Sequence, residues 1–265
     1  MSETSVLLEA VEELARLGGS RALEHFKKAL AVEWKSDGSP VTQADRATET
    51  LMRDWIAKRF PDDGIFGEEF PEHKPGAAQR WIIDPIDGTF SFMRGVPLWG
   101  TLVAVVRGDQ VIAGAINCPA ADEIVCGAKG EGCWSNGTRC RVSNVAQLSA
   151  ATVLTTDMRV ASSPTKREKI HALVAATAAF RGWSDCYGYL LLATGRAEIV
   201  VDPVMAPWDA AALVPVIEEA GGVFTDWTNR ATAFGGSAIA TNAALAPEVR
   251  RVLGVEVVRE ERSLR

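Results

Sequence analysis

One short segment of the chain combines the residue types that hold a divalent metal ion against a phosphate group. It reads Trp-Ile-Ile-Asp-Pro-Ile-Asp-Gly-Thr, so an apolar run precedes two carboxylates three residues apart. We expect a buried strand ending at Asp84, with Asp84, the Ile86 carbonyl oxygen and Asp87 directed toward one point. Gly88 lets the backbone approach an anion closely, and the N–H groups of Gly88 and Thr89 can donate to a phosphate oxygen. A solvated surface turn, the alternative, would not need an apolar lead-in.

Two further acidic groups complete a candidate metal site. Glu68 and Glu69 follow a short apolar run, and Asp209 stands at the start of an expected helix behind Pro207. Such groups can converge in space although they are far apart in sequence. Hard cations such as Mg²⁺ prefer oxygen ligands, which suits a set without His or Cys. Taken alone, each group is equally explained as a solvated turn or a helix-terminal acid, so the prediction depends on the three groups together.

The three groups carry a resemblance to a known family. The chain resembles the inositol monophosphatase family of Mg²⁺-dependent, lithium-sensitive phosphatases in Gly67-Glu68-Glu69, Asp84-Pro85-Ile86-Asp87-Gly88-Thr89, Trp208-Asp209-Ala210-Ala211 and Glu219-Ala220-Gly221-Gly222. The resemblance covers nearly the whole chain. It implies a layered α+β or α/β fold, an αβαβα sandwich with two sheets between helix layers. Within the family the chain is most similar to the histidinol-phosphate phosphatase branch, in the segments that begin at Pro40, Arg94 and Asp185.

The resemblance implies which residues hold metal. Glu68, Asp84 and the Ile86 carbonyl would hold a first Mg²⁺ ion, and Asp84, Asp87 and Asp209 would hold a second. Two or three ions are expected, with Mn²⁺ as the alternative metal. Paired ions lower the pKa of a bound water and stabilise the leaving alkoxide, so no covalent phosphoenzyme is required.

The resemblance also implies which groups act on the attacking water. Glu68, and Thr89 oriented by Asp45, would position and deprotonate it. Glu69 would contact and orient the metal ligands or serve as an occasional extra ligand, and Thr42 would orient Asp45. Helix capping is the alternative role for Thr42 and Asp45, and it does not exclude the catalytic one.

Two acidic positions distinguish the chain from the polyol phosphatases of the family. Asp185 stands where the inositol phosphatases have a small apolar residue, and Asp202 stands where they have an acid that contacts ring hydroxyls. Carboxylates near the leaving group favour a cationic alcohol, and histidinol carries an ammonium group and an imidazole. Arg181 is a further candidate for substrate binding. A helix cap at Asp185 and a plain turn at Asp202 are the alternatives.

We therefore expect a Mg²⁺-dependent phosphomonoesterase that releases phosphate from L-histidinol phosphate in histidine synthesis. An inositol-1-phosphate phosphatase or a broad-specificity phosphatase is the alternative in the same class, and a metal-dependent binding protein without catalysis is a more distant one. Cys133 and Arg139 also satisfy the C-x5-R pattern of cysteine phosphatases. That chemistry needs a helix after the loop, whereas Asn136-Gly137 predicts a hairpin turn and residues 140–143 predict a strand.

Composition describes an ordinary acidic globular protein. The 265 residues are 47% hydrophobic with a formal charge of −6, and no basic cluster of the kind that binds nucleic acid stands out. No apolar run reaches the length of a membrane span, and the start of the sequence does not resemble a signal peptide. Five cysteines without a C-x-x-C pair predict free thiols. We expect a cytoplasmic protein that acts on a small phosphorylated metabolite, and similar proteins suggest a homodimer.

Hydrophobic spacing predicts helices layered on sheets. Helices are expected over 5–30, 44–60, 165–178, 184–193 and 210–220; strands are expected near 65, 81–83, 101–107, 111–117, 123–128, 133, 152–155, 198–201, 223 and 239. We expect one compact unit in two parts. Residues 1–145 would carry most metal ligands, and residues 146–265 would carry Asp209 and the substrate-selecting residues.

Overall fold

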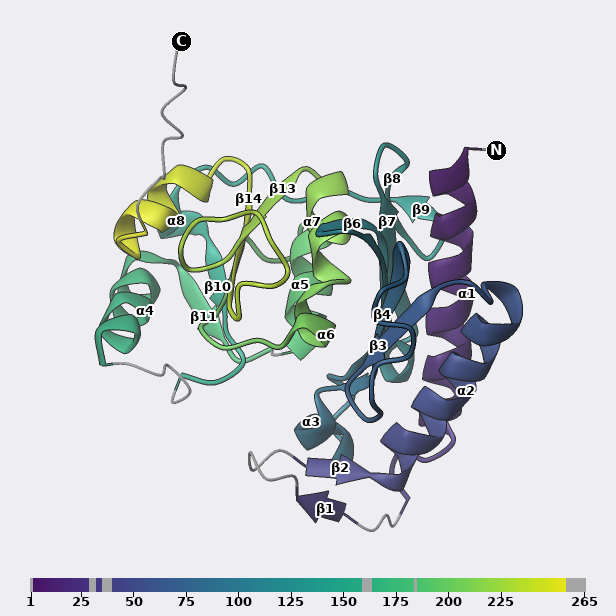
Figure 1. Cartoon of the computed structure of the whole chain (residues 1–265). Coiled ribbons are helices and arrows are strands. Elements are labelled where there is room, and N and C mark those ends of the chain that lie inside the picture. Colours follow the sequence, from purple (N-terminus) through teal and green to yellow (C-terminus); the bar gives the residue numbers. More distant parts are fainter. Residues whose placement is uncertain (1, 29–31, 35–39, 159–163, 184, 256–265) are drawn as a thin grey trace.

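The computed structural model describes residues 2–28, 32–34, 40–158, 164–183 and 185–255. Its helices are α1 (Glu3–Leu23), α2 (Gln43–Arg59), α3 (Thr89–Met93), α4 (Pro164–Ala176), α5 (Asp185–Ala193), α6 (Pro207–Ala210), α7 (Leu213–Glu219) and α8 (Ala246–Val252), with 3-10 turns at Pro119–Ala121 and Leu148–Ala150. Helix and sheet layers alternate across the molecule (Figure 1). None of the helices in these ranges is both long and apolar enough to cross a membrane.

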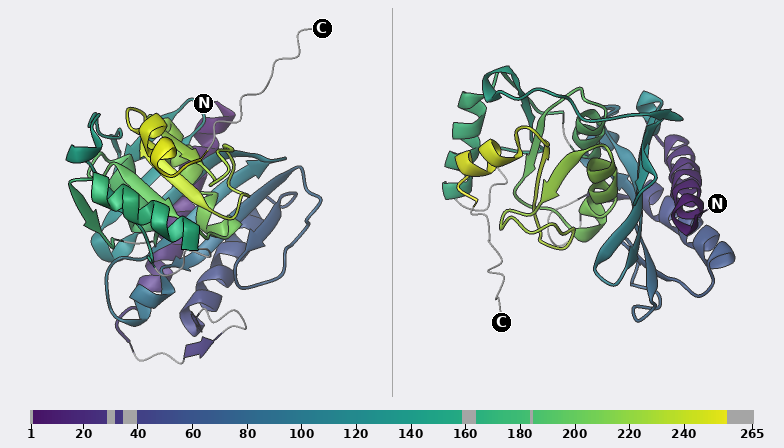
Figure 2. Two further views of the ribbon diagram at one scale, coloured as in Figure 1. Left: turned by 90° about the vertical axis from the view of Figure 1, so that its left-hand side faces the viewer. Right: turned by 90° about the horizontal axis from the view of Figure 1, so that it is seen from above.

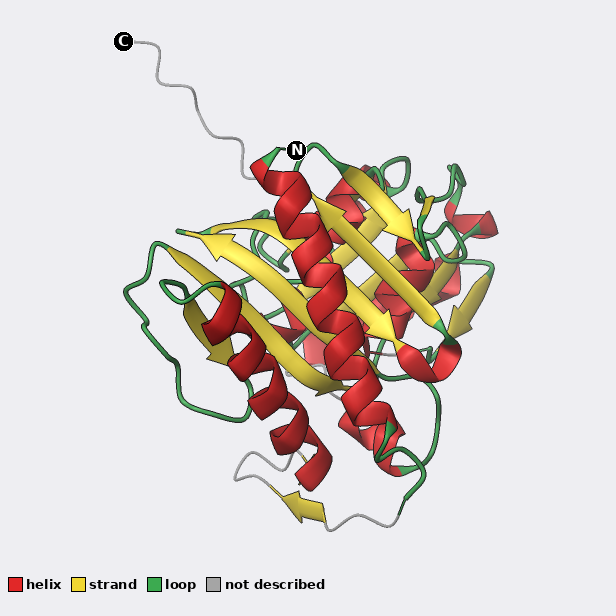
Figure 3. Ribbon diagram, turned by 90° about the vertical axis from the view of Figure 1, so that its right-hand side faces the viewer, coloured by secondary structure: helices red, strands yellow, loops and turns green. Residues whose placement is uncertain are grey.

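A seven-stranded sheet lies beneath α1 and α2 (Figure 3). Its strands, in spatial as well as chain order, are β3 (Gly64–Gly67), β4 (Gln79–Asp87), β5 (Gly100–Arg107), β6 (Gln110–Cys118), β7 (Glu123–Ala128), β8 (Gly132–Ser135) and β9 (Thr138–Arg139). Side chains alternate between the two faces of a strand. Trp81 and Ile83 therefore pack toward α1 and α2, while Ile82 packs on the opposite face. Strand β4 is thus buried on both sides and gives the site a rigid support.

A five-stranded sheet forms the second β layer. Its strands are β10 (Thr152–Leu154), β11 (Ala179–Arg181), β12 (Ile199–Asp202), β13 (Gly222–Thr225) and β14 (Ala238–Asn242), in the spatial order β11-β10-β12-β14-β13. Helices α5 and α7 pack between the two sheets, and α4 and α8 cover the outer face of the second sheet (Figure 2). The result is the expected αβαβα sandwich.

Most predicted elements are present, and the differences have identifiable causes. The helix predicted over residues 210–220, directly after Asp209, divides into α6 and α7. Pro215 lacks an N–H group and its ring would clash with the carbonyl of Ala211, which breaks the helix there. The strand predicted over residues 140–143 is absent, because the Val142 N–H donates to the Ala220 carbonyl in the turn after α7.

Several short elements had no prediction. They are the hairpin of β1 (Val32–Trp34) and β2 (Pro40–Thr42), strand β11, and helices α3 and α8. The first predicted helix ends earlier, at Leu23, and the predicted helix start at residue 184 lies outside the described residues. The division at residue 145 stays a prediction, although the seven-stranded sheet ends at Arg139 and the five-stranded sheet begins at Thr152.

Candidate metal centre and active site

A β-bulge near the end of β4 places the first two carboxylates. Asp84 pairs with Leu102 of β5, but the next pair joins Asp87 to Gly100, so β4 carries one extra residue at this point. The Ile86 N–H donates to Asp84 Oδ1 over 2.9 Å. A bulge bends its strand and redirects side chains, and the apolar lead-in seen in the sequence keeps this one rigid. The predicted strand thus continues through both acids.

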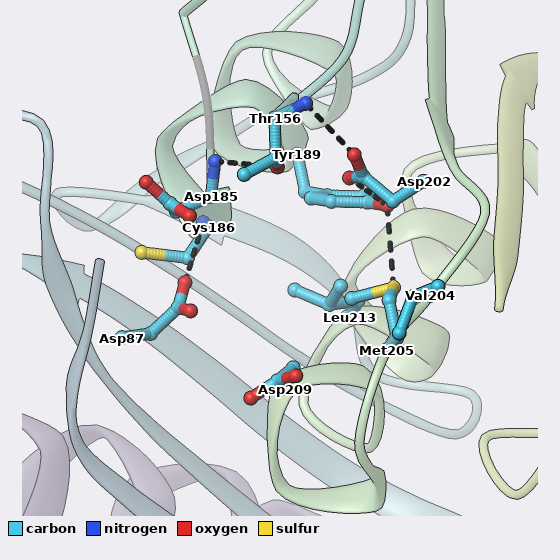
Figure 4. Close-up of a pocket in the computed structure, with 10 residues that line it drawn as sticks. All are labelled: Asp87, Thr156, Asp185, Cys186, Tyr189, Asp202, Val204, Met205, Asp209 and Leu213. Carbon is cyan, nitrogen blue, oxygen red and sulfur yellow. Dashed lines mark hydrogen bonds between the residues drawn. The ribbon is translucent and has the colours of Figure 1, made fainter. Parts of the chain in front are cut away.

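Asp209 approaches from the opposite side of the site. It lies in the first turn of α6, behind Pro207 at the helix start, and its Oδ2 accepts a hydrogen bond from the Ala206 N–H over 2.8 Å. One carboxylate oxygen each from Asp84, Asp87 and Asp209 lies within 4.8 Å of the others. Figure 4 shows Asp87 and Asp209 facing each other across the cavity. The structure therefore brings together acids more than a hundred residues apart in the chain.

Glu68 belongs to the same charge cluster. Strand β3 runs parallel to β4 with Gly67 opposite Ile83, so Glu68 leaves its strand beside Asp84. Burial raises the pKa of Asp84 well above its usual value, and the charges of Glu68, Asp87 and Asp209 raise it further. Burial raises the pKa of Asp209 to about 7, with Glu68 as an added cause.

The donor set fits a hard divalent cation. Burial also raises the pKa of Asp87, and the charges of Asp185 and Asp209 raise it further. Crowded, partly buried carboxylates repel one another, and a cation among them removes that penalty. All the gathered donors are oxygens, as Mg²⁺ and Mn²⁺ prefer, and the Ile86 carbonyl is the one predicted backbone ligand.

The turn after Asp87 has the shape of an anion cradle. Gly88 has a φ of 84°, which favours glycine, and a Cβ there would lie 3.1 Å from both Asp185 Oδ2 and the Leu98 carbonyl oxygen. The Thr89 hydroxyl donates to the Ile86 carbonyl oxygen over 3.0 Å. A side chain at position 88 would therefore fill the space beside the acids.

Thr42 and Asp45 form the predicted helix cap at the start of α2. The Thr42 N–H and hydroxyl both donate to Asp45 Oδ2, over 2.8 and 2.6 Å, and Asp45 is buried. Burial raises the pKa of Asp45 to about 6, and the charge of Glu69 contributes. The predicted orientation of Thr89 by Asp45 stays a prediction, because in the structure Thr89 bonds to Ile86 and Asp45 to Thr42.

Asp185 lies at the cavity beside the metal ligands. It has a φ of 53°, a left-handed conformation that Asp tolerates better than most residues, and its N–H donates to the Thr156 hydroxyl over 3.1 Å. The next N–H, of Cys186, donates to Asp87 Oδ2 over 2.6 Å. The start of α5 is thus joined directly to a candidate metal ligand. The cavity measures about 90 Å³ and is lined by Asp87, Thr156, Asp185, Cys186, Tyr189, Asp202, Val204, Met205, Asp209 and Leu213 (Figure 4).

Asp202 lines the cavity, but the protein itself occupies both of its carboxylate oxygens. Oδ1 accepts from the Thr156 N–H over 2.8 Å and the Thr155 hydroxyl over 3.3 Å, and Oδ2 accepts from the Tyr189 hydroxyl over 2.8 Å. Sequence reasoning missed Thr156, Tyr189 and Cys186. The Thr pair directly after the apolar strand β10 is the signal that could have found Thr156.

Arg181 is not among the residues that line this cavity. It is exposed at the end of β11, where its Nη1 donates to the Phe180 carbonyl oxygen over 2.7 Å. Its role in substrate binding stays a prediction.

The cysteine-phosphatase alternative loses its structural basis. Cys133 is buried in β8, and Asn136 and Gly137 form the predicted hairpin turn with positive φ values of 45° and 76°. No helix follows Arg139 within residues 140–147. The neighbouring Cys140 and burial raise the pKa of the Cys133 thiol, so the thiolate that the chemistry needs is disfavoured.

Comparison with known proteins gives one family. The model of the inositol monophosphatase family matches residues 3–259. A histidinol-phosphatase of Chlorobaculum parvum is 44% identical over 88% of this chain and 90% of that protein, and a histidinol-phosphatase of Mycobacterium tuberculosis is 36% identical over 83% and 86%. The solved structure of an inositol monophosphatase from Zymomonas mobilis has a TM-score of 0.85 at 31% identity and covers 96% of this chain and all of that one.

Proposed function

The chain belongs to the inositol monophosphatase family, and from that premise we propose that it is a Mg²⁺-dependent phosphatase that converts L-histidinol phosphate and water to L-histidinol and phosphate. The observation that carries the proposal is the convergence of Asp84, Asp87 and Asp209 oxygens within 4.8 Å. The 44% identity to a histidinol-phosphatase supports the substrate.

We assign the metal-binding role to the acids on both sides of the cavity. Asp84, Asp87 and Asp209, with Glu68 and the Ile86 carbonyl, would hold the two or three ions. When bound, Mg²⁺ supplies positive charge that stabilises the phosphate and the leaving oxygen and lowers the pKa of water. The buried β4 strand fixes Asp84, Ile86 and Asp87 in advance, which lowers the cost of assembling the site.

The remaining groups bind the phosphate and the attacking water. The N–H groups of Gly88 and Thr89 would donate to phosphate oxygens in the turn that favours glycine. Glu68 would accept a proton from the water, with Thr89 holding its orientation and Asp45 supporting Thr89 from the start of α2. Glu69 would strengthen the negative field behind Asp45.

We assign the choice of substrate to Asp185. Its carboxylate borders the Gly88 cradle, so it lies where the leaving alcohol of a bound phosphate ester would emerge. A negative charge there favours an ammonium or imidazolium group over a neutral polyol. Asp202 would act indirectly, because its oxygens already hold Thr156 and Tyr189.

A phosphate-release assay tests the proposal. Purified protein with Mg²⁺ is given histidinol phosphate, inositol 1-phosphate and a sugar phosphate, with and without EDTA. We expect preference for histidinol phosphate and loss of activity in EDTA that excess Mg²⁺ restores. Preference for inositol 1-phosphate, or equal use of both, would favour the alternative named by the Zymomonas structure. No phosphate release at saturating Mg²⁺ would favour a binding protein.

We further infer a cytoplasmic homodimer that serves histidine synthesis. Five free cysteines suit a reducing compartment. Trp183 is 41% exposed beside an apolar cavity of about 480 Å³ that Leu98, Tyr187, Leu191 and Arg196 also line, a surface that a second copy could cover. Light scattering on the eluting protein tests this, and a monomer at micromolar concentration would contradict it.

A further inference from the structure

A buried acid outside the candidate ligand set lies against the turn that carries Glu68. Glu49 belongs to α2, four residues after Asp45, and its side chain is fully buried. Its Oε2 accepts from the Glu69 N–H over 2.8 Å, and its Oε1 accepts from Arg53 Nε over 2.7 Å. Both oxygens therefore have protein donors, and the buried charge has a cation beside it. Glu49 is built to hold the chain rather than to bind an ion.

Gly67 shows how closely the turn is pressed against this carboxylate. A Cβ at position 67 would lie 2.3 Å from Glu49 Oε1, which is closer than any real contact. The glycine is therefore required by the approach of the Glu49 carboxylate. The Gly-Glu-Glu sequence thus includes one residue whose size is set by a residue eighteen positions earlier.

Arg53 contacts the other end of the turn, at Phe70. Its Nη2 donates to the Phe70 carbonyl oxygen over 3.0 Å, and its guanidinium lies 5.7 Å from the centre of the Phe70 ring. Contacts from α2 therefore reach Gly67, Glu69 and Phe70, which flank Glu68 on both sides. A residue held between fixed neighbours loses little freedom when it binds a ligand.

We propose that Glu49, with Arg53, is a positioning residue for Glu68 and sets the affinity of the site for its metal. The inference rests on the proposed metal-dependent function, because it assigns Glu68 to the ligand set. Partners behind a metal ligand typically change metal affinity or activity by about 10–100-fold when they are removed. The effect belongs to metal binding, since Glu49 itself faces the turn and not the cavity residues.

Glu49→Gln tests the proposal. Glutamine has an NH₂ group in place of one carboxylate oxygen, so that group would face one of the two donors, Arg53 Nε or the Glu69 N–H, and that hydrogen bond is lost. We expect the half-saturating Mg²⁺ concentration to rise about tenfold or more. At saturating Mg²⁺, kcat and the KM for histidinol phosphate should stay within about threefold of the wild type. The rise in melting temperature that Mg²⁺ alone produces should need correspondingly more Mg²⁺, which gives a readout without substrate.

Glu12→Gln is the matched control. Glu12 also pairs with an arginine four residues later, at 2.8 Å from Arg16, but on α1 and away from the acidic turn. The Glu12→Gln variant should leave the Mg²⁺ concentration needed for activity unchanged. If Glu49→Gln does not fold, two further variants test the positioning role through the Mg²⁺ requirement. Gly67→Ala pushes the turn away from the Glu49 carboxylate, and Arg53→Lys removes the hydrogen bond to the Phe70 carbonyl.

The outcomes separate the two proposals. Wild-type enzyme without Mg²⁺-dependent phosphate release would defeat the proposed function itself. An active wild type whose folded Glu49, Gly67 and Arg53 variants all need the same Mg²⁺ concentration within twofold would overturn the positioning role alone. Loss of kcat that no Mg²⁺ concentration restores would also overturn it, because a purely structural defect does not respond to metal.

Discussion

The two sides of the active site are built in different ways. On the sheet side, Asp84 and Asp87 take their places from one β-bulge in a buried strand, within four residues of sequence. On the helix side, Asp185 depends on a chain of contacts between distant segments. Its N–H bonds to the Thr156 hydroxyl, and the Thr156 N–H bonds to Asp202.

The two sides also differ in what satisfies their carboxylates. Asp84 stands among like charges that, together with burial, raise its pKa, whereas Asp202 accepts three hydrogen bonds from the protein. An acid crowded by other acids is suited to a cation, and an acid supplied with donors is suited to hold its neighbours. The bond from the Cys186 N–H to Asp87 joins the two sides. We therefore expect substitution of the metal-binding acids to abolish catalysis, and substitution of Asp185 or Asp202 on the helix side to change selectivity or stability.

Asp84→Asn should have the largest effect. Asparagine keeps the shape and an acceptor for the Ile86 N–H but removes the charge that two ions would share. We expect kcat/KM to fall by about a thousandfold, or ~4 kcal/mol of transition-state stabilisation. Without Mg²⁺ the same variant should be at least as stable as the wild type to heat, because the repulsion within the cluster falls.

Asp109→Asn is the control for that variant, since Asp109 is exposed in the hairpin between β5 and β6. It should leave activity and stability unchanged. If Asp84→Asn kept more than a tenth of the activity, Asp84 would not be a metal ligand that catalysis needs, and the role given to the sheet side would be wrong.

Sequence reasoning predicted the sheet side better than the helix side, for a physical reason. Asp84, Asp87 and Gly88 are neighbours in sequence, so their residue types and spacing already describe the geometry. The partners of Asp185 come from other segments. The Thr pair after β10 marks Thr156 as a polar residue at a strand end, but it does not show that Thr156 lies beside Asp185. Asp202 was expected to touch substrate, because the sequence does not show that Tyr189 and Thr156 occupy its oxygens.

In the fold as well, elements with a local sequence pattern are predictable, and elements that depend on contacts between distant segments are not. Long alternating or helical patterns such as β4 to β7 and α2 are found where they were predicted. Strand β11 has three residues, and only its parallel pairing with β10 makes it a strand. The break between α6 and α7 has a local cause in the sequence, because Pro215 disrupts the helical turn that precedes it.

Asp185→Asn tests the selectivity of the helix side. Asn tolerates the left-handed backbone at this position, so the substitution removes charge without adding backbone strain. We expect the preference for histidinol phosphate over inositol 1-phosphate to fall by about tenfold, or ~1.4 kcal/mol, through a higher KM for histidinol phosphate. The Mg²⁺ requirement should change by less than threefold. An unchanged ratio of kcat/KM for the two substrates would remove Asp185 from the specificity argument.

Asp202→Ala should act mainly on stability. It leaves the Thr156 N–H and the buried Tyr189 hydroxyl without this acceptor, which costs about 2–3 kcal/mol of unfolding free energy. Because Thr156 holds Asp185, we also expect kcat/KM to fall several-fold. Tyr189→Phe removes only one of these bonds and should cost about 1 kcal/mol. A direct contact between Asp202 and substrate would instead give a large rise in KM with unchanged stability.

Cys133→Ser should have the smallest effect on activity. It tests whether the Cys133 sulfur, rather than water, attacks phosphorus. Cys133 is fully buried in β8, 3.4 Å from the Cys140 sulfur and on a different element from each of the acids. A buried hydroxyl in place of the thiol costs about 1 kcal/mol of stability, so we expect a lower melting temperature with kcat within twofold of the wild type. Phosphate release is measured with and without EDTA. If Cys133→Ser abolished activity and the wild type stayed active in EDTA, the acidic cluster would not be the catalytic centre.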